Sequence, residues 1–130
     1  MAVQYITYQD NRSNGNGKWY GRAIAPATLN LEAMAKRIER SCSMTHGDVL
    51  GVLTELVEVM NNHITNGNKV KLPGVGTFYV NIRSKGAQSE EDFKGANIKG
   101  VAVKFLPEGK KVNGNMTRAF TDGITFIRAK

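Results

Sequence analysis

The feature that most constrains this chain is a long segment of helical periodicity with an unusually broad apolar face. The segment opens at "THGD", where Thr45 offers a capping hydroxyl and Asp48 supplies an acid three residues later. It ends at Asn66-Gly67, a signal for a left-handed helix C-cap. The apolar residues at helical spacing are Val49, Val52, Leu53, Leu56, Val57, Met60 and Ile64, and Leu50 and Val59 widen the stripe.

So broad an apolar face needs more cover than the short elements around it can supply. An exposed patch of this size would aggregate, and burial against a second copy is the economical solution. We therefore expect a homodimer with residues 45–65 at its centre. The residues assigned to this interface are Val49, Val52, Leu53, Leu56, Val57, Met60 and Phe78.

The segment before the long helix predicts a β-hairpin over residues 2–25 and then a shorter helix. "VQYITYQD" and "KWYGRAIA" are typical of strands, and the Asn- and Gly-rich "NRSNGNG" between them is typical of a turn. The aromatic residues of this hairpin would serve either as cross-strand pairs, the favoured interpretation, or as a base-stacking platform; they are Tyr5, Tyr8, Trp19 and Tyr20. A helical pattern begins at Thr28 and fails near "SCSM".

The second half of the chain predicts a sheet. "KVKLPGVGTFYVNIRSKG", residues 69–86, is a strand, a turn on two glycines and a second strand. Val101, Val103 and Phe105 alternate with polar or small residues, so they predict a partner strand. The polar stretch between the two strands is either an extended arm or a mobile loop. "EGKKVNGNM" is too rich in glycine for more than one helical turn, and "GITFIRAK" predicts a short strand accepted by the core helices and sheet.

The net charge of +7 is concentrated in the C-terminal half. Residues 1–30 carry three basic and one acidic side chain, and residues 31–68 carry three and five. Residues 69–130 carry twelve basic and five acidic side chains, a balance of +7. This asymmetry indicates a polyanionic partner on one face. The alternative is that the charge only promotes solubility.

No motif indicates an enzyme, a metal site or a cofactor. His46 and His63 are the only histidines, and Cys42 lies across a predicted helix break from His46. "GVG" lacks the third glycine and the lysine of a phosphate-binding loop. Glu90, Glu91 and Asp92 are interpreted as solvated surface. No small-molecule substrate, membrane span or secretory signal is indicated, and a single cysteine favours a reducing cytoplasm.

The order of these elements resembles the HU/IHF family of bacterial histone-like DNA-binding proteins. "MTHGDV" stands where that family opens its second helix, and "NGNKVKLPGVGTF" matches its helix-to-hairpin signature. The match spans residues 31–83 and is weaker around "VAVKFLPEGKKV". The N-terminal hairpin and C-terminal strand resemble a longer HU-related subfamily of Bacteroides-type bacteria.

The resemblance implies an α+β fold: an intertwined dimer with a helical base, a β-sheet saddle and β-arms that wrap the DNA minor groove. We expect one HU-like domain over residues 1–130. It divides into an N-terminal hairpin extension (1–27), a helical dimerisation base (28–66), a saddle and arm (67–107) and a C-terminal segment (108–130).

The expected DNA-binding residues are cations of the saddle, the arm and the segment after it. They are Lys69, Lys71, Arg83, Lys85, Lys94, Lys99, Lys104, Lys110, Lys111 and Arg118. The family's arm tip carries a proline wedge, which "GAQSEEDFKGAN" lacks. Phe93 is a possible substitute wedge, although packing against its own arm is favoured.

Two functions follow from the sequence. The first is a histone-like, homodimeric DNA-binding protein of the cytoplasmic nucleoid that binds duplexes with little sequence preference. The second keeps the HU-like fold as a dimerisation scaffold that binds a protein partner and not DNA. The missing proline and the three acids favour the second, and the basic C-terminal half favours the first.

Overall fold

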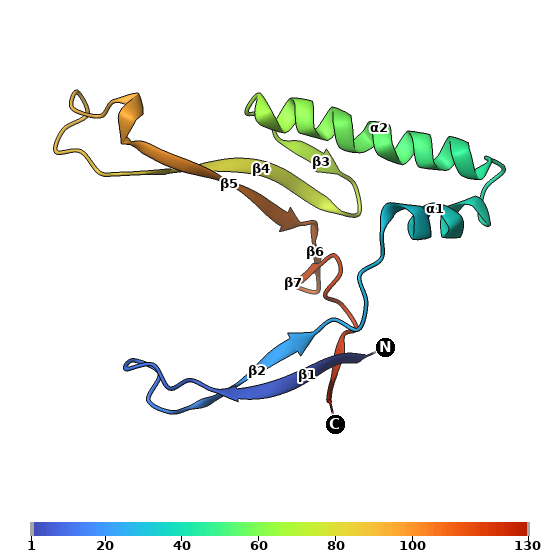
Figure 1. The fold of residues 1–130 in the computed structure, drawn as a ribbon, viewed down its shortest axis with the longest axis horizontal. Coiled ribbons are helices and arrows are strands. Elements are labelled where there is room, and N and C mark those ends of the chain that lie inside the picture. Colours follow the sequence, from blue (N-terminus) through green and yellow to red (C-terminus); the bar gives the residue numbers. More distant parts are fainter. Residues whose placement is uncertain (1, 130) are drawn as a thin grey trace.

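The computed structural model describes residues 2–129 as an α+β chain with two helices and three small sheets (Figure 1). This confirms the expected fold class. In chain order the elements are β1 (Ala2–Gln9), β2 (Trp19–Ile24), α1 (Leu31–Glu39), α2 (His46–Thr65), β3 (Val70–Leu72), β4 (Gly76–Ser84), a 3-10 turn (Gly95–Asn97), β5 (Ile98–Pro107), β6 (Gly109–Val112), β7 (Asn115–Arg118) and β8 (Thr125–Arg128).

The long helix α2 begins and ends where the sequence predicts. Thr45 is its N-cap and its hydroxyl accepts the Asp48 amide at 3.2 Å. Gly67 follows the C-cap with a φ of +88°, a conformation that favours glycine. The first helix begins at Leu31, so the predicted start at Thr28 is wrong. Asn30 is its cap because the side-chain oxygen accepts the Ala33 amide at 2.9 Å.

The central sheet has the strand order β3-β4-β5, and its tight turn depends on two glycines. Gly74 has a φ of +81° in the turn after Pro73, where Val75 N–H donates to Leu72 O at 2.9 Å. Gly76 has a φ of +149°, and a Cβ there would lie 2.3 Å from Leu106 O. Both positions confirm that the turn requires glycine, and β5 packs directly against the backbone of Gly76.

A second sheet joins the two ends of the described chain, in the order β2-β1-β8. The β1–β2 hairpin confirms the prediction for residues 2–25. Tyr8 and Tyr20 are cross-strand partners with ring centroids 6.0 Å apart. The strand in "GITFIRAK" forms, but its expected place against the core helices and sheet is wrong. It pairs in parallel with β1, Ala2 opposite Thr125, apart from α1 and α2 in Figure 1.

The third sheet is a hairpin of β6 and β7, in place of the single helical turn considered for "EGKKVNGNM". Asn113 and Gly114 connect the strands with φ values of +53° and +82°. Positive φ at both central residues is the geometry of a two-residue type I′ hairpin turn, which Asn-Gly favours. Glycine here therefore closes a hairpin and does not merely interrupt a helix.

The single chain has very little core. Among the hydrophobic side chains of residues 2–129, Ala35 and Val49 alone are buried. The chain exposes 10905 Å² of surface, whereas a compact monomer of 14.3 kDa exposes about 6,800 Å². On α2, Val52 and Val57 remain 57% and 59% exposed. No helix within the described residues is both long and apolar enough to span a membrane.

Candidate nucleic-acid interface

The pairing of β4 with β5 separates an apolar face from a polar one, because residues directly opposite each other point to the same side. Phe78 lies opposite Phe105, with ring centroids 4.7 Å apart. Val80 and Val103, two positions along, lie on the same face and line an apolar hollow with Ile64 of α2. The apolar side of the hairpin is therefore the side turned toward the long helix.

The opposite face gathers cations from the three strands and from the residue just before β3. We call this surface the cationic face, and it consists of Lys69, Lys71, Arg83 and Lys104 with Thr77 and Tyr79. Lys104 lies opposite Tyr79, and Lys71 lies opposite Thr77. The Lys69 ammonium stands 5.3 Å from the centre of the Tyr79 ring, a cation–π contact. The structure thus brings four of the predicted DNA-binding residues together on one side of the sheet.

Further cations lie at the root of the arm, where the pairing becomes irregular. Arg83 is opposite Gly100 and Ser84 is opposite Ile98, so Lys99 is an extra residue with no partner on β4. The Arg83 side chain lies beside Gly100, and its Nη2 is 3.5 Å from where an added Cβ would stand, an ordinary van der Waals distance. The Lys85 amide donates to Asn97 O at 2.7 Å and closes the root of the arm.

The arm tip is a compact turn that carries the three acidic residues Glu90, Glu91 and Asp92. The Asp92 amide donates to Ser89 Oγ, and the Phe93 amide donates to Glu90 O, each at 3.2 Å. Phe93 is 40% exposed. The Lys94 amide donates to Asn97 Oδ1 at 3.0 Å, which connects the tip to the 3-10 turn. The three carboxylates form no ion pair within residues 2–129.

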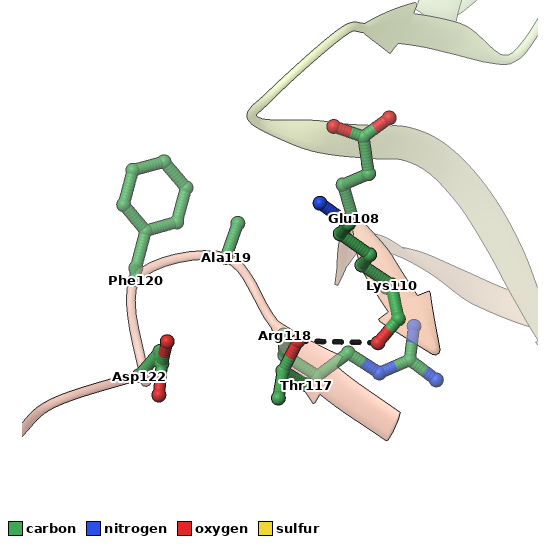
Figure 2. Close-up of a pocket in the computed structure, with 8 residues that line it drawn as sticks. Glu108, Lys110, Thr117, Arg118, Ala119, Phe120 and Asp122 are labelled. Carbon is green, nitrogen blue, oxygen red and sulfur yellow. Dashed lines mark hydrogen bonds between the residues drawn. The ribbon is translucent and has the colours of Figure 1, made fainter. Parts of the chain in front are cut away.

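The remaining predicted cations belong to the β6–β7 hairpin. Lys110 and Lys111 are adjacent on β6 and so point to opposite faces of it. Arg118 reaches back toward the central sheet, and its Nη1 donates to Pro107 O at 3.1 Å. Figure 2 shows this hairpin, with Thr117 Oγ1 donating to Lys110 O at 3.1 Å.

Sequence reasoning missed Glu108, the residue that attaches this hairpin to the saddle turn. Its carboxylate Oε2 accepts the Gly74 amide, and its own amide donates to Val75 O at 3.1 Å. Its carbonyl oxygen accepts the Ala119 amide at 2.8 Å. The sequence signal was the Pro-Gly turn, which leaves the Gly74 amide without a partner inside the turn. The acceptor lies too far along the chain for a local pattern to identify it.

Few acidic groups neutralise these cations. Within residues 2–129, Arg12 pairs with Asp10, and His46 lies within 4 Å of the Glu32 and Glu39 carboxylates; both contacts are outside the central sheet. The hydrogen bonds from Arg12 hold the pKa of the Asp10 carboxyl below its usual value. The described part of the chain contains no group of three His, Cys, Asp or Glu residues placed to hold a metal ion.

A helical pair followed by a sheet with one apolar and one cationic face, extended into a β-arm, is the architecture of HU-like proteins. The chain belongs to the HU-HIG family, described as an HU domain fused to a wHTH, Ig or glycine-rich motif, whose family model matches residues 1–121. A comparison with curated proteins finds no match.

The solved structures that are similar to the chain include the following two. One is a candidate bacterial DNA-binding protein from Bacteroides vulgatus, with a TM-score of 0.54 and 11% identity; the alignment covers 80% of this chain and 41% of that protein. The chain therefore spans about two-fifths of that protein's length. The other is HU from Anabaena in a cocrystal with DNA, with a TM-score of 0.42 and 22% identity, covering 62% of this chain and 85% of that one.

Proposed function

We propose that this chain is a histone-like architectural protein that binds duplex DNA as a homodimer, with little sequence preference. The observation that carries the proposal is the cationic face. Four basic side chains, three from β3, β4 and β5 and one from Lys69 just before β3, lie on one side of the sheet and have no carboxylate partner within residues 2–129. Unpaired cations held on a sheet suit the regularly spaced phosphates of a duplex.

The low sequence preference follows from the types of residue on this face. Lysine and arginine contacts to phosphate fix the position of the protein but read no bases. The cationic face has one aromatic ring, Tyr79, which is engaged by Lys69. Affinity should therefore come from the release of counterions and fall steeply as salt rises.

The homodimer is supported by the surface that the single chain leaves uncovered. The excess over a compact monomer is about 4,000 Å², and the apolar face of α2 contributes Val52, Leu56 and Val57 to it. Val49 is only 3% exposed in the single chain, so its own protomer already covers this side chain without a partner. Pairing through α2 would place two saddles side by side and give one continuous cationic surface.

The arms would follow the minor groove without a proline wedge. On this proposal Arg83, Lys85 and Lys99 at the arm root would contact phosphates, whereas phosphates would repel the carboxylates of the tip. Phe93 is the apolar side chain available at the tip, and it is 40% exposed. A protein of this kind would act in the nucleoid.

A second function is favoured by the arm tip and by the outer sheet. The exposed carboxylates of Glu90, Glu91 and Asp92 do not suit contact with DNA. The sheet β2-β1-β8 has two open edges, at β2 and β8, where a partner could add a strand. On this alternative, the HU-like body is a dimerisation scaffold for a protein partner.

Fluorescence anisotropy with labelled linear, nicked and four-way-junction DNA, each titrated at several salt concentrations, tests the first function. We expect binding that weakens with salt and favours the distorted forms. Absence of binding to all three DNAs at low salt would contradict the proposal and favour the scaffold.

A further inference from the structure

A shallow hollow of about 200 Å³ lies where the saddle meets the β6–β7 hairpin. Lys71 and Thr77 border it from the cationic face, and Arg118 borders it from β7. Lys71 and Thr77 are direct partners across β3 and β4, so their side chains project on the same side of the sheet. The hollow therefore combines two cations and a hydroxyl that come from opposite ends of the second half of the chain.

The guanidinium of Arg118 is held in position before any ligand arrives. Its Nη1 donates to Pro107 O at 3.1 Å. The side chain lies across Gly109, where an added Cβ would come within 2.7 Å of the same nitrogen. This hydrogen bond uses one of the five N–H groups of arginine. No other hydrogen bond from this guanidinium occurs within residues 2–129, so the rest of its fork can serve a ligand.

The charge of the hollow favours an oxyanion. Neither Lys71 nor Arg118 has an ion-pair partner in the described part of the chain. Glu108 also borders the hollow, but its carboxylate accepts the Gly74 amide. Figure 2 shows that carboxylate pointing away from the Arg118 guanidinium. A planar arginine fork, a lysine ammonium and a hydroxyl donor together suit the oxygens of a phosphate group.

We propose that Lys71, Thr77 and Arg118 form a binding site for a single phosphate group of a nucleic-acid backbone. The site lies at the end of the saddle that carries the turn between β3 and β4. The assignment to nucleic acid rests on the proposed function, whereas the phosphate site rests on the hollow itself. The β6–β7 hairpin then has a specific role, because it carries Arg118 to a phosphate that the saddle strands reach with Lys71 and Thr77.

The test uses the single variants Lys71→Gln and Arg118→Gln and the double variant that combines them. The control is Lys36→Gln, which removes one positive charge from α1. Duplex affinity is measured by anisotropy over a series of salt concentrations. Each single variant should lose affinity about tenfold, and the control should match the unaltered protein. Because the two residues share one phosphate in each protomer, the salt slope of the homodimeric double variant should fall by about 2, one for each copy of the site.

A second experiment uses inorganic phosphate as the probe and does not depend on DNA binding. The backbone amides of Thr77 and Gly109, followed by nuclear magnetic resonance, should shift on titration in the unaltered protein and not in the double variant. Shifts in a protein that binds no duplex would support the phosphate site and overturn its assignment to nucleic acid.

The site is overturned by either of two results. One is a multiplicative loss in the double variant with a slope lowered by about 4, which would mean two separate phosphates for each protomer of the dimer. The other is unchanged affinity in both single variants without any amide shift. The Lys71 side chain makes no hydrogen bond or ion pair within the described residues, so its replacement by glutamine should leave the fold intact and keep the test decisive.

Discussion

The carboxylate of Glu108 accepts a hydrogen bond from the backbone amide of Gly74, thirty-four residues earlier in the chain. With the backbone bond between the Glu108 amide and Val75 O, it attaches the β6–β7 hairpin to the turn between β3 and β4. The orientation of Arg118 relative to Lys71 therefore depends on a residue that itself carries negative charge.

Replacing Glu108 with alanine should lower the free energy of unfolding by about 1 kcal/mol, because the Gly74 amide loses its acceptor. Glu108→Gln, which keeps a carbonyl oxygen, should lose less. Urea denaturation measures both changes. Glu91→Ala, at the exposed arm tip, is the control and should leave the unfolding free energy unchanged. Equal stability of Glu108→Ala and the unaltered chain would show that this contact does not hold the hairpin.

Replacing Gly76 with alanine should be far more disruptive. The new Cβ would meet Leu106 O at 2.3 Å, from a backbone with a φ of +149°. Either β4 and β5 separate locally or the backbone strains, and we expect a loss of about 3 kcal/mol. Thermal unfolding measures it. Gly86→Ala is the matched control, because nothing lies within 4 Å of its added Cβ.

The arm can be tested by replacing Arg83, Lys85 and Lys99 together with glutamine. Both the affinity for duplex DNA and its dependence on salt should fall, because three cations leave the root of the arm. Anisotropy at several salt concentrations provides both quantities. Unchanged binding after the triple replacement would exclude the arm from the DNA interface, whatever the saddle contributes.

The proposed dimer predicts that a charge on the exposed face of α2 will separate the protomers. Val57 is 59% exposed in the single chain, so lysine there should not disturb the protomer itself. Light scattering after size-exclusion chromatography should show a shift from dimer to monomer for Val57→Lys. Asn62→Lys, on the other side of the same helix, should remain dimeric.

The pairing of Asp10 with Arg12 predicts a pH dependence in the β1–β2 loop. Arg12 donates to both carboxylate oxygens at 2.9 Å, and this lowers the pKa of Asp10. The stabilisation is therefore present above the ordinary carboxyl pKa of 3.8 and is lost as the pH falls through the lower value in the folded chain. A carbon-13 titration of the Asp10 carboxyl measures that value, and Arg12→Gln should raise it.

Local signals in the sequence were sufficient for the helices, the turns and the strands that pair with near neighbours. The Thr45 cap, the Asn66-Gly67 stop and the Gly74–Gly76 turn each depend on residues a few positions apart. The β6–β7 hairpin had an equally local signal in Asn113-Gly114. It was missed because the glycines were weighed only as helix breakers, although the same pair is the preferred type I′ turn.

The same local patterns predicted only part of the candidate nucleic-acid interface. Alternation along β4 predicts one apolar face, but the register with β5 decides that Lys104 joins Tyr79 on the other face. The partner of β8 and the acceptor for the Gly74 amide are long-range choices that no short pattern encodes. Arg118 illustrates the same limit, since a hydrogen bond to Pro107 sets its direction.

The parallel pairing of β1 with β8 also orders events during synthesis. The β1–β2 hairpin is made before the helices and the saddle, but β8, the strand that completes its sheet, is made after them. Until then β1 keeps an open edge while the helices and the saddle form. This sheet can therefore be completed only after the helices and the saddle have been made, and a nascent chain halted before β8 would expose an edge of β1 that β8 otherwise covers.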